Sequence, residues 1–130
     1  MVAQQGYEYG RPEAGQAAVE YALVVTLLLM MTFGGVEVFR ALYVRNTVAA
    51  AAYEGARYGI TRPTDFNGIR ARVIQVSVAV DLEPSDITVD CGRCTRGSWI
   101  NVAITYQFES SFSLVVPNMT FTTSAKYYIK

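Results

Sequence analysis

Cys91 and Cys94 have the CxxC spacing that supports either thiol redox chemistry or a structural disulfide. A catalytic pair of this kind opens a helix, whereas Gly92 and the following Arg96-Gly97 are typical of a hairpin turn. We therefore predict a structural disulfide between the two cysteines, which suits a domain outside the reducing cytoplasm. Two cysteines are also too few to form a zinc site by themselves.

The remaining residue types argue against an enzyme. The chain of 130 residues contains no histidine, the commonest general base and metal ligand. It also lacks a glycine-rich phosphate loop, a nucleophile motif and a catalytic pair of carboxylates. We expect no catalytic site, no metal and no cofactor. Lysine and arginine total 11, and aspartate and glutamate also total 11, so no basic field indicates a nucleic-acid partner.

Four acidic side chains lie close together in the sequence, at Asp81, Glu83, Asp86 and Asp90. Carboxylates of this kind can hold calcium, but their spacing matches no calcium-binding loop, and we interpret the group as a solvated acidic edge. Asn118 begins an Asn-x-Thr sequence, a candidate N-glycosylation site that also occurs often by chance.

Glu20 stands at the head of an uncharged segment, the sixteen residues Tyr21–Val36. As a helix this segment is ~24 Å long, against ~30 Å for a hydrocarbon core. Its central part is apolar on all sides apart from two threonines, and a protein this small cannot surround it, which favours a membrane helix over a buried core helix. An ionised carboxylate within a membrane costs roughly 2.5–3.5 kcal/mol, so Glu20 needs a partner.

The helix is predicted to continue well beyond the uncharged segment. No proline interrupts residues 16–58, an apolar stripe recurs there at helical spacing, and Gly59 is a suitable terminator. Gly34 and Gly35 weaken the helix locally, by roughly 1 kcal/mol each relative to alanine. They are compatible with two interpretations, which are close helix packing and a hinge.

Residues 59–130 are predicted to form a small α+β domain. Residues 69–80 fit both a helix and a strand, and we favour a helix because Arg70 and Arg72 then lie on its outer side. Apolar and polar residues alternate in three later segments, which predicts a three-stranded antiparallel sheet packed on the distal half of the long helix. The expected buried residues are Ile87 and Val89, then Ile100, Val102, Ile104, Tyr106 and Phe108, then Phe121, Thr123, Ala125, Tyr127 and Ile129.

The segment Gly15–Val25, with the sequence GQAAVEYALVV, resembles the processing site and N-terminal helix of type IV pilins. The continuation GVEVFR at residues 35–40, Arg45-Asn46, and YEGARY at residues 53–58 look like the TadE-like branch of that superfamily. These are pilins and pseudopilins of tight-adherence (Flp) pilus systems. The resemblance covers residues 15–59, and it implies a type IV pilin-like fold with a second helix in the small domain.

The resemblance also implies how the N-terminus is processed and used. Residues 1–15 would be a polar leader, and a prepilin peptidase would cut between Gly15 and Gln16 on the cytoplasmic face. Glu20 would then be the fifth residue of the mature chain. As in the family, its carboxylate would neutralise the terminal amine of an adjacent subunit in the filament, where an unpaired charge is strongly disfavoured.

The function implied is that of a structural subunit, a minor pilin or pseudopilin, because the major tight-adherence pilins are usually much shorter. The chain would cross the inner membrane once with its C-terminal domain outside, and would later join an extracellular filament. Its partners would be like or unlike filament subunits, the membrane, the prepilin peptidase and the pilus assembly platform. The alternatives are a major pilin, a membrane-anchored binding domain that never polymerises, and a redox enzyme that uses the cysteine pair. The spacing of Gly15 and Glu20 favours a filament subunit over a simple anchor.

Overall fold

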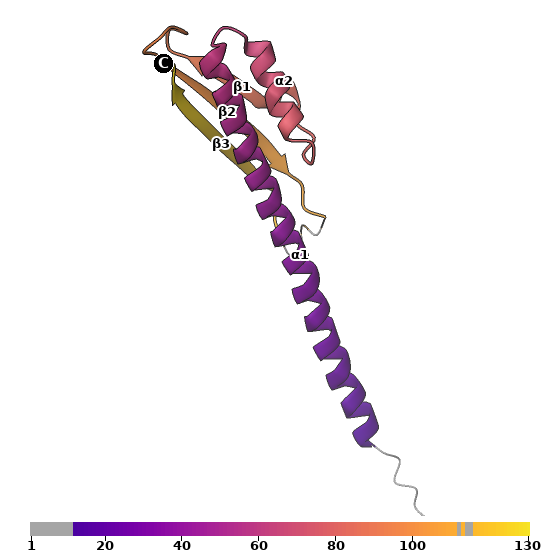
Figure 1. Ribbon diagram of the computed structural model, residues 1–130. Helices are drawn as coiled ribbons and strands as arrows, with labels where there is room; N and C mark the ends of the chain where they lie inside the picture. The colour runs from indigo at the N-terminus through magenta and orange to yellow at the C-terminus, as the bar shows by residue number, and fades with distance from the viewer. Residues whose placement is uncertain (1–11, 112, 114–115) are drawn as a thin grey trace, which may run out of the picture. The chain divides into compact units, whose positions relative to one another are not determined.

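The structure, a computed structural model, describes residues 12–111, 113 and 116–130. Its elements are helix α1 (Pro12–Thr61), helix α2 (Phe66–Val76), the 3-10 helix η1 (Pro84–Asp86), and strands β1 (Ile87–Cys91), β2 (Trp99–Phe108) and β3 (Met119–Tyr128) (Figure 1). These elements confirm the predicted α+β fold. The chain divides into two compact units between Gly35 and Val36.

Helix α1 is longer than the predicted range of residues 16–58. It begins at Pro12, a residue whose fixed φ and missing N–H suit a first helical position. It ends at Thr61, and the next N–H group, of Arg62, donates to the carbonyl of Tyr58 at 3.2 Å. Gly59, the expected terminator, instead lies inside the helix. Residues 1–11 of the predicted leader lie outside the described residues.

In the second unit, α1 packs on the sheet through a face of small side chains. These residues recur every three or four positions and are buried: Ala41, Val44, Val48, Ala51, Ala52 and Ala56. Two glycines continue this face. A Cβ at Gly55 would overlap the side chain of Val73 in α2, and one at Gly59 would overlap Ile100 in β2. The glycines therefore allow α1 to approach both α2 and the sheet closely, and Gly59 serves this packing inside the helix and not its termination.

The sheet has the strand order β1-β2-β3, and both pairs are antiparallel. The register places Ile87 opposite Ile104, and Trp99 opposite Tyr128. As predicted, β2 buries one face, with Ile100, Val102, Ile104 and Phe108 in the core and Tyr106 partly buried against it. Burying each such side chain contributes about 1.5–3 kcal/mol, so this strand supplies much of the stability of the unit.

The ambiguous segment is a helix, as predicted, although it ends at Val76 and not at residue 80. Asp65 caps α2 by accepting a hydrogen bond from the N–H of Gly68 at 2.9 Å, and Ile69 and Val73 are fully buried. Figure 1 shows α2 beside α1 on the same side of the sheet. Arg70 does not lie on the outer side, because it is half-buried and its Nε donates to the carbonyl of Ile87 in β1 at 3.4 Å.

Strand β3 buries less than its alternating pattern predicts. Ala125 is buried within it and Ile129 just beyond it, but Phe121 and Thr123 are only partly buried and Tyr127 is exposed. The reason is position, because β3 is an edge strand with a neighbour on one side only. Tyr127 instead meets Tyr53 of α1 edge to face, with ring centroids 6.4 Å apart.

Candidate functional site

The first unit of the structure consists of an apolar stretch of α1 whose side chains are exposed. The helix passes the length and hydropathy criteria for a membrane span, and only 11% of its most apolar 18-residue window is buried. Its two threonines are satisfied internally, since Thr26 Oγ1 donates to the Ala22 carbonyl at 2.7 Å and Thr32 Oγ1 to the Leu28 carbonyl at 2.8 Å. A helix with its hydroxyls bonded in this way has no polar group that needs water. This segment can serve as a membrane anchor.

The residues predicted for processing and assembly lie at the start of this stretch. Gly15, Gln16 and Glu20 are all exposed and helical, and a side chain at Gly15 would meet no other atom. Glu20 lies one turn after Gln16, so the two side chains share a face of the helix. No described residue of the chain forms an ion pair or hydrogen bond with the Glu20 carboxylate. Its carboxylate is therefore available to a group outside this chain.

Gly34 and Gly35 lie inside a continuous helix, at the point where the chain divides into its two units. The space beside Gly35 is open, so its lack of a side chain is not needed for packing within the chain. Close packing against another molecule and hinge motion both stay predictions.

A second exposed apolar surface lies on α1 in the second unit, opposite the face that packs on the sheet. We define this surface as the α1 strip, and its large side chains are Val36, Phe39, Leu42 and Tyr43. Phe39 is 75% exposed, and each of the others exposes nearly half or more of its surface. Contiguous apolar residues of this kind mark interaction surfaces. The sequence placed Leu42 in one helical stripe with Val44 and Val48, and it did not separate this exposed side of the helix from the buried side.

Glu37 is a buried carboxylate that the sequence did not single out for a role. It is 4% exposed and lies on the domain side of α1. Its Oε1 accepts a hydrogen bond of 2.8 Å from the backbone N–H of Ser111, in the connection between β2 and β3. Arg40 supports this contact, since its Nη1 is 3.5 Å from Glu37 Oε1 and donates to Ser111 Oγ at 3.1 Å. Its guanidinium also lies over the Phe108 ring at 5.2 Å. Glu37 thus holds the β2–β3 connection against α1.

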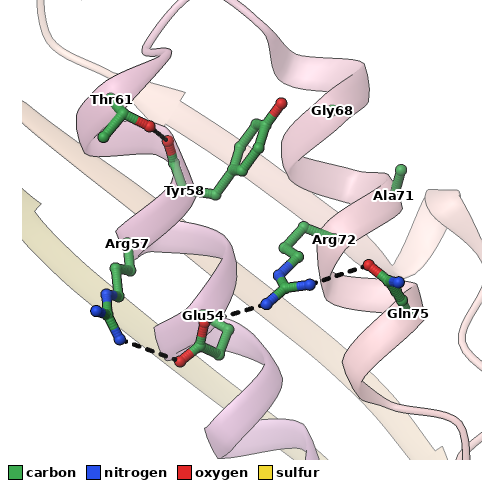
Figure 2. Close-up of a pocket in the computed structure, with 8 residues that line it drawn as sticks. All are labelled: Glu54, Arg57, Tyr58, Thr61, Gly68, Ala71, Arg72 and Gln75. Atoms are coloured by element: carbon green, nitrogen blue, oxygen red, sulfur yellow. Dashed lines mark hydrogen bonds and ion pairs between the residues drawn. The ribbon is translucent and has the colours of Figure 1, made fainter.

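An open groove between α1 and α2 gathers most of the other charged contacts (Figure 2). Glu54 lies between two guanidinium groups, at 3.7 Å from Arg57 of its own helix and 3.8 Å from Arg72 of α2. Arg72 also donates to Gln75 at 3.0 Å. Ion pairs this exposed contribute at most about 1 kcal/mol each. The Glu54–Arg72 pair joins the two helices, and the charged residues of the groove satisfy one another without a ligand.

Cys91, the last residue of β1, is disulfide-bonded as predicted to Cys94 in the loop that leads to β2. The loop is closed by hydrogen bonds from the N–H of Gly92 to the Trp99 carbonyl and from the N–H of Arg93 to Ser98 Oγ. The hairpin setting of the pair also agrees with the prediction. Gly97 adopts a φ of 81°, in the left-handed region that glycine tolerates best.

The other two candidate sites have local structural roles. Asp86 Oδ2 accepts from the N–H of Glu83 at 3.0 Å, which caps η1, and within the described part of the chain no group of three or more acidic, cysteine or histidine side chains is arranged to hold a metal ion. Asn118 is exposed, and its Oδ1 accepts from the N–H of Ser110 at 3.0 Å. Whether Asn118 is glycosylated stays a prediction.

Comparison with protein families gives one match, and it lies within α1. Residues 15–57 match the family of TadE-like proteins, which confirms the resemblance to that family over the greater part of α1. The match indicates a membrane-associated component of tight-adherence pilus systems. No curated protein and no solved structure matches the chain. The matched range contains Gly15, Glu20 and Glu37, and it ends before α2 and the sheet begin.

Proposed function

We propose that this chain is a structural subunit, a minor pilin or pseudopilin, of a filament of the tight-adherence type. It would anchor in the membrane through the first part of α1 and then assemble into the filament through the same helix. The observation that carries this proposal is the α1 strip. Apart from Val36, it lies beyond the uncharged segment, on a part of the helix that also carries Glu37, Arg40 and Arg45.

A simple membrane anchor does not explain the α1 strip. The uncharged segment is ~24 Å long, and the apolar residues 17–19 before Glu20 extend the span to the ~30 Å of a hydrocarbon core. Residues beyond Val36 are therefore not needed for an anchor, and they would face water on the side away from the sheet. Phe39 and Tyr43 are exposed there, at a cost that the burial of apolar surface against another subunit would offset. A helix that is apolar all round in one part and along one side in the next suits successive membrane and filament environments.

The exposed carboxylate of Glu20 supports the same proposal. Once the leader is removed, the new amino group lies at Gln16, one helical turn away. A neighbouring subunit that is shifted along the filament axis would bring its own terminal amine to Glu20. The pair would neutralise both charges in an apolar surrounding, and it would fix the axial position of one subunit relative to the next.

We propose no catalytic role. The one pair of residues that suggested redox chemistry is a disulfide in a hairpin loop, and it does not open a helix. The disulfide supports a location of the C-terminal domain outside the cytoplasm, where such bonds persist. The partners proposed are therefore other filament subunits, the prepilin peptidase, and the platform that extracts subunits from the membrane.

Substitution of Phe39 tests the role of the α1 strip. We expect Phe39→Ser to leave the protein folded and in the membrane fraction but to reduce strongly its amount in sheared surface filaments. The matched control is Val78→Ser, which also removes an apolar side chain, here one that is 87% exposed and lies in the turn after α2. Immunoblots of the two fractions provide the measurement. Equal incorporation of both variants would contradict assembly through the strip and would favour a non-polymerising anchor.

Substitution of Glu20 tests the proposed pairing with the terminal amine. Glu20→Ala should be processed and inserted normally, because it makes the helix more apolar, but it should assemble poorly. Glu20→Asp keeps the charge on a shorter side chain and should restore part of the assembly. Filaments that incorporate Glu20→Ala as well as the original chain would exclude a pairing role.

A further inference from the structure

The loop between β1 and β2 forms a hollow whose lining carries cations but no carboxylate. The hollow has a volume of about 390 Å³ and is lined by Gly92, Arg93, Thr95, Arg96, Gly97, Ser98 and Trp99. Its side chains offer two guanidinium groups, two hydroxyls and an indole N–H. In a chain with equal numbers of acidic and basic residues, this gathering of donors is a local feature.

The two arginines of this loop differ from three arginines elsewhere in the second unit, which are ion-paired. Arg40, Arg57 and Arg72 each lie within 4 Å of a glutamate carboxylate. Arg93 and Arg96 are exposed, and neither forms an ion pair with any described residue. Their positive charge is therefore not neutralised within the described part of the molecule.

The adjoining end of the sheet extends this cationic surface. The Lys126 ammonium lies 4.4 Å from the centre of the Trp99 ring, and Tyr128 is the cross-strand partner of Trp99 and is 68% exposed. Across the sheet, Asp90 of β1 pairs with Asn101 of β2, which in turn pairs with Lys126 of β3. No ion pair joins Asp90 and Lys126. The surface thus combines Arg93, Arg96 and Lys126 with an exposed aromatic ring and a single carboxylate.

The loop is held in shape before any ligand arrives. The disulfide closes one half of it, and the N–H of Gly97 donates to the carbonyl of Ile129 at 2.9 Å while the N–H of Ile129 donates to the carbonyl of Ser98 at 2.8 Å. These bonds tie the loop to the C-terminal end of β3, beside which it lies in Figure 1. A loop with a fixed conformation loses less entropy when it binds a ligand.

We propose that this loop binds an acidic polysaccharide, through carboxylates that pair with Arg93 and Arg96. Guanidinium groups form paired hydrogen bonds with carboxylates, and the hydroxyls of Thr95 and Ser98 and the indole N–H of Trp99 match the many hydroxyls of a sugar. The exposed ring of Tyr128 provides an apolar face for a sugar ring. The inference extends the proposed function, since it rests on the loop lying outside the cell.

A nucleic acid fits this surface less well. Single strands bind along a cationic track with aromatic rings on which successive bases stack. Here one face of the Trp99 ring is already covered by Lys126, and the cations surround a hollow of limited size. The hollow lies at the lower end of the range for small-ligand pockets, which suits one or two sugar units of a chain.

The experiment measures binding by the purified full-length protein in detergent, which requires no filament assembly. The probes are a fluorescent alginate oligosaccharide, a neutral dextran oligosaccharide of equal length, and a short single-stranded DNA. We expect alginate to bind, dextran not to bind, and DNA to bind more weakly than alginate. The double variant Arg93→Gln, Arg96→Gln should weaken alginate binding at least about tenfold, because it removes two charge-assisted contacts.

The matched control is Arg45→Gln, Arg57→Gln, which changes the net charge equally at two exposed arginines of α1. This variant should bind alginate as the original chain does. Equal losses in the two double variants, no binding of alginate, or tighter binding of DNA would each overturn the proposal. Thermal unfolding confirms that both variants remain folded. The binding experiment requires no filaments, so absence of alginate binding would not contradict the proposed subunit function. Likewise, a chain that does not enter filaments could still bind alginate.

Discussion

Glu37→Ala is expected to destabilise the second unit far more than Glu54→Ala does. Both residues are glutamates in α1, so the change in helix propensity is the same and cancels in the comparison. Glu37 is buried and accepts a 2.8 Å hydrogen bond from the Ser111 N–H, whereas Glu54 is partly exposed and has ion pairs no shorter than 3.7 Å. A hydrogen bond to a charged group contributes about 1.5–3 kcal/mol, and each exposed ion pair about 0–1 kcal/mol.

A loss of about 2 kcal/mol lowers the unfolding temperature of a unit this size by roughly 8–16 °C, against a few degrees for Glu54→Ala. Thermal unfolding of the full-length protein in detergent, followed by circular dichroism, measures both shifts. Hydrogen exchange localises the effect, because the Ser111 amide should lose its protection in Glu37→Ala and keep part of it in Glu37→Gln, which still offers an acceptor oxygen. Equal shifts for the two alanine variants would refute the role assigned to Glu37.

Two further predictions concern the core and the disulfide. Val102→Ala should lower the free energy of unfolding by about 2 kcal/mol, since it removes methyl groups from a fully buried side chain, while Val78→Ala at a highly exposed position should change it by less than about 0.5 kcal/mol. Chemical denaturation of the two variants provides the comparison, and similar midpoints would contradict the packing of β2. The double variant Cys91→Ser, Cys94→Ser closes no loop and should lose at most about 2 kcal/mol while still folding and assembling. Measurable disulfide exchange by the original chain that this variant lacks would contradict a purely structural bond.

The sequence predicted the elements of the fold better than their ends. Uninterrupted apolar periodicity was enough to predict one long helix, and strict alternation was enough to predict β2. Gly59 was wrongly expected to end α1, because its role depends on contact with Ile100, which lies 41 residues later in the chain. A glycine that allows close packing and one that terminates a helix have the same sequence signal.

In α2, a local signal distinguishes a helix from a strand where the apolar pattern does not. Periodicity alone fitted a helix or a strand over residues 69–80. The cap at Asp65 and the buried pair Ile69 and Val73 belong to a helix. It ends early because Ser77 accepts a hydrogen bond from the Val80 N–H in a turn and donates its hydroxyl to the Ile74 carbonyl.

The contacts of Glu37 and of the cationic loop could not be predicted from the sequence. Glu37 and Ser111 are 74 residues apart, and the connection that carries Ser111 has no periodicity to place it. In the β1–β2 loop, the sequence drew attention only to the cysteines and the turn. The cationic surface beside the loop depends on the register of β2 and β3, which brings Trp99, Lys126 and Tyr128 together. In contrast, Gly15, Gln16 and Glu20 carry a local pattern, and the family match includes all three.

The intact mass of this chain in sheared surface filaments tests the central claim most directly. The account predicts a mass equal to residues 16–130 (with any modification of Gln16), and it predicts that the same species is absent from cells that carry Gly15→Leu. A filament-associated chain that still includes residues 1–15 would contradict processing between Gly15 and Gln16. A processed chain found only in membranes, with none in the filaments, would contradict its function as a filament subunit.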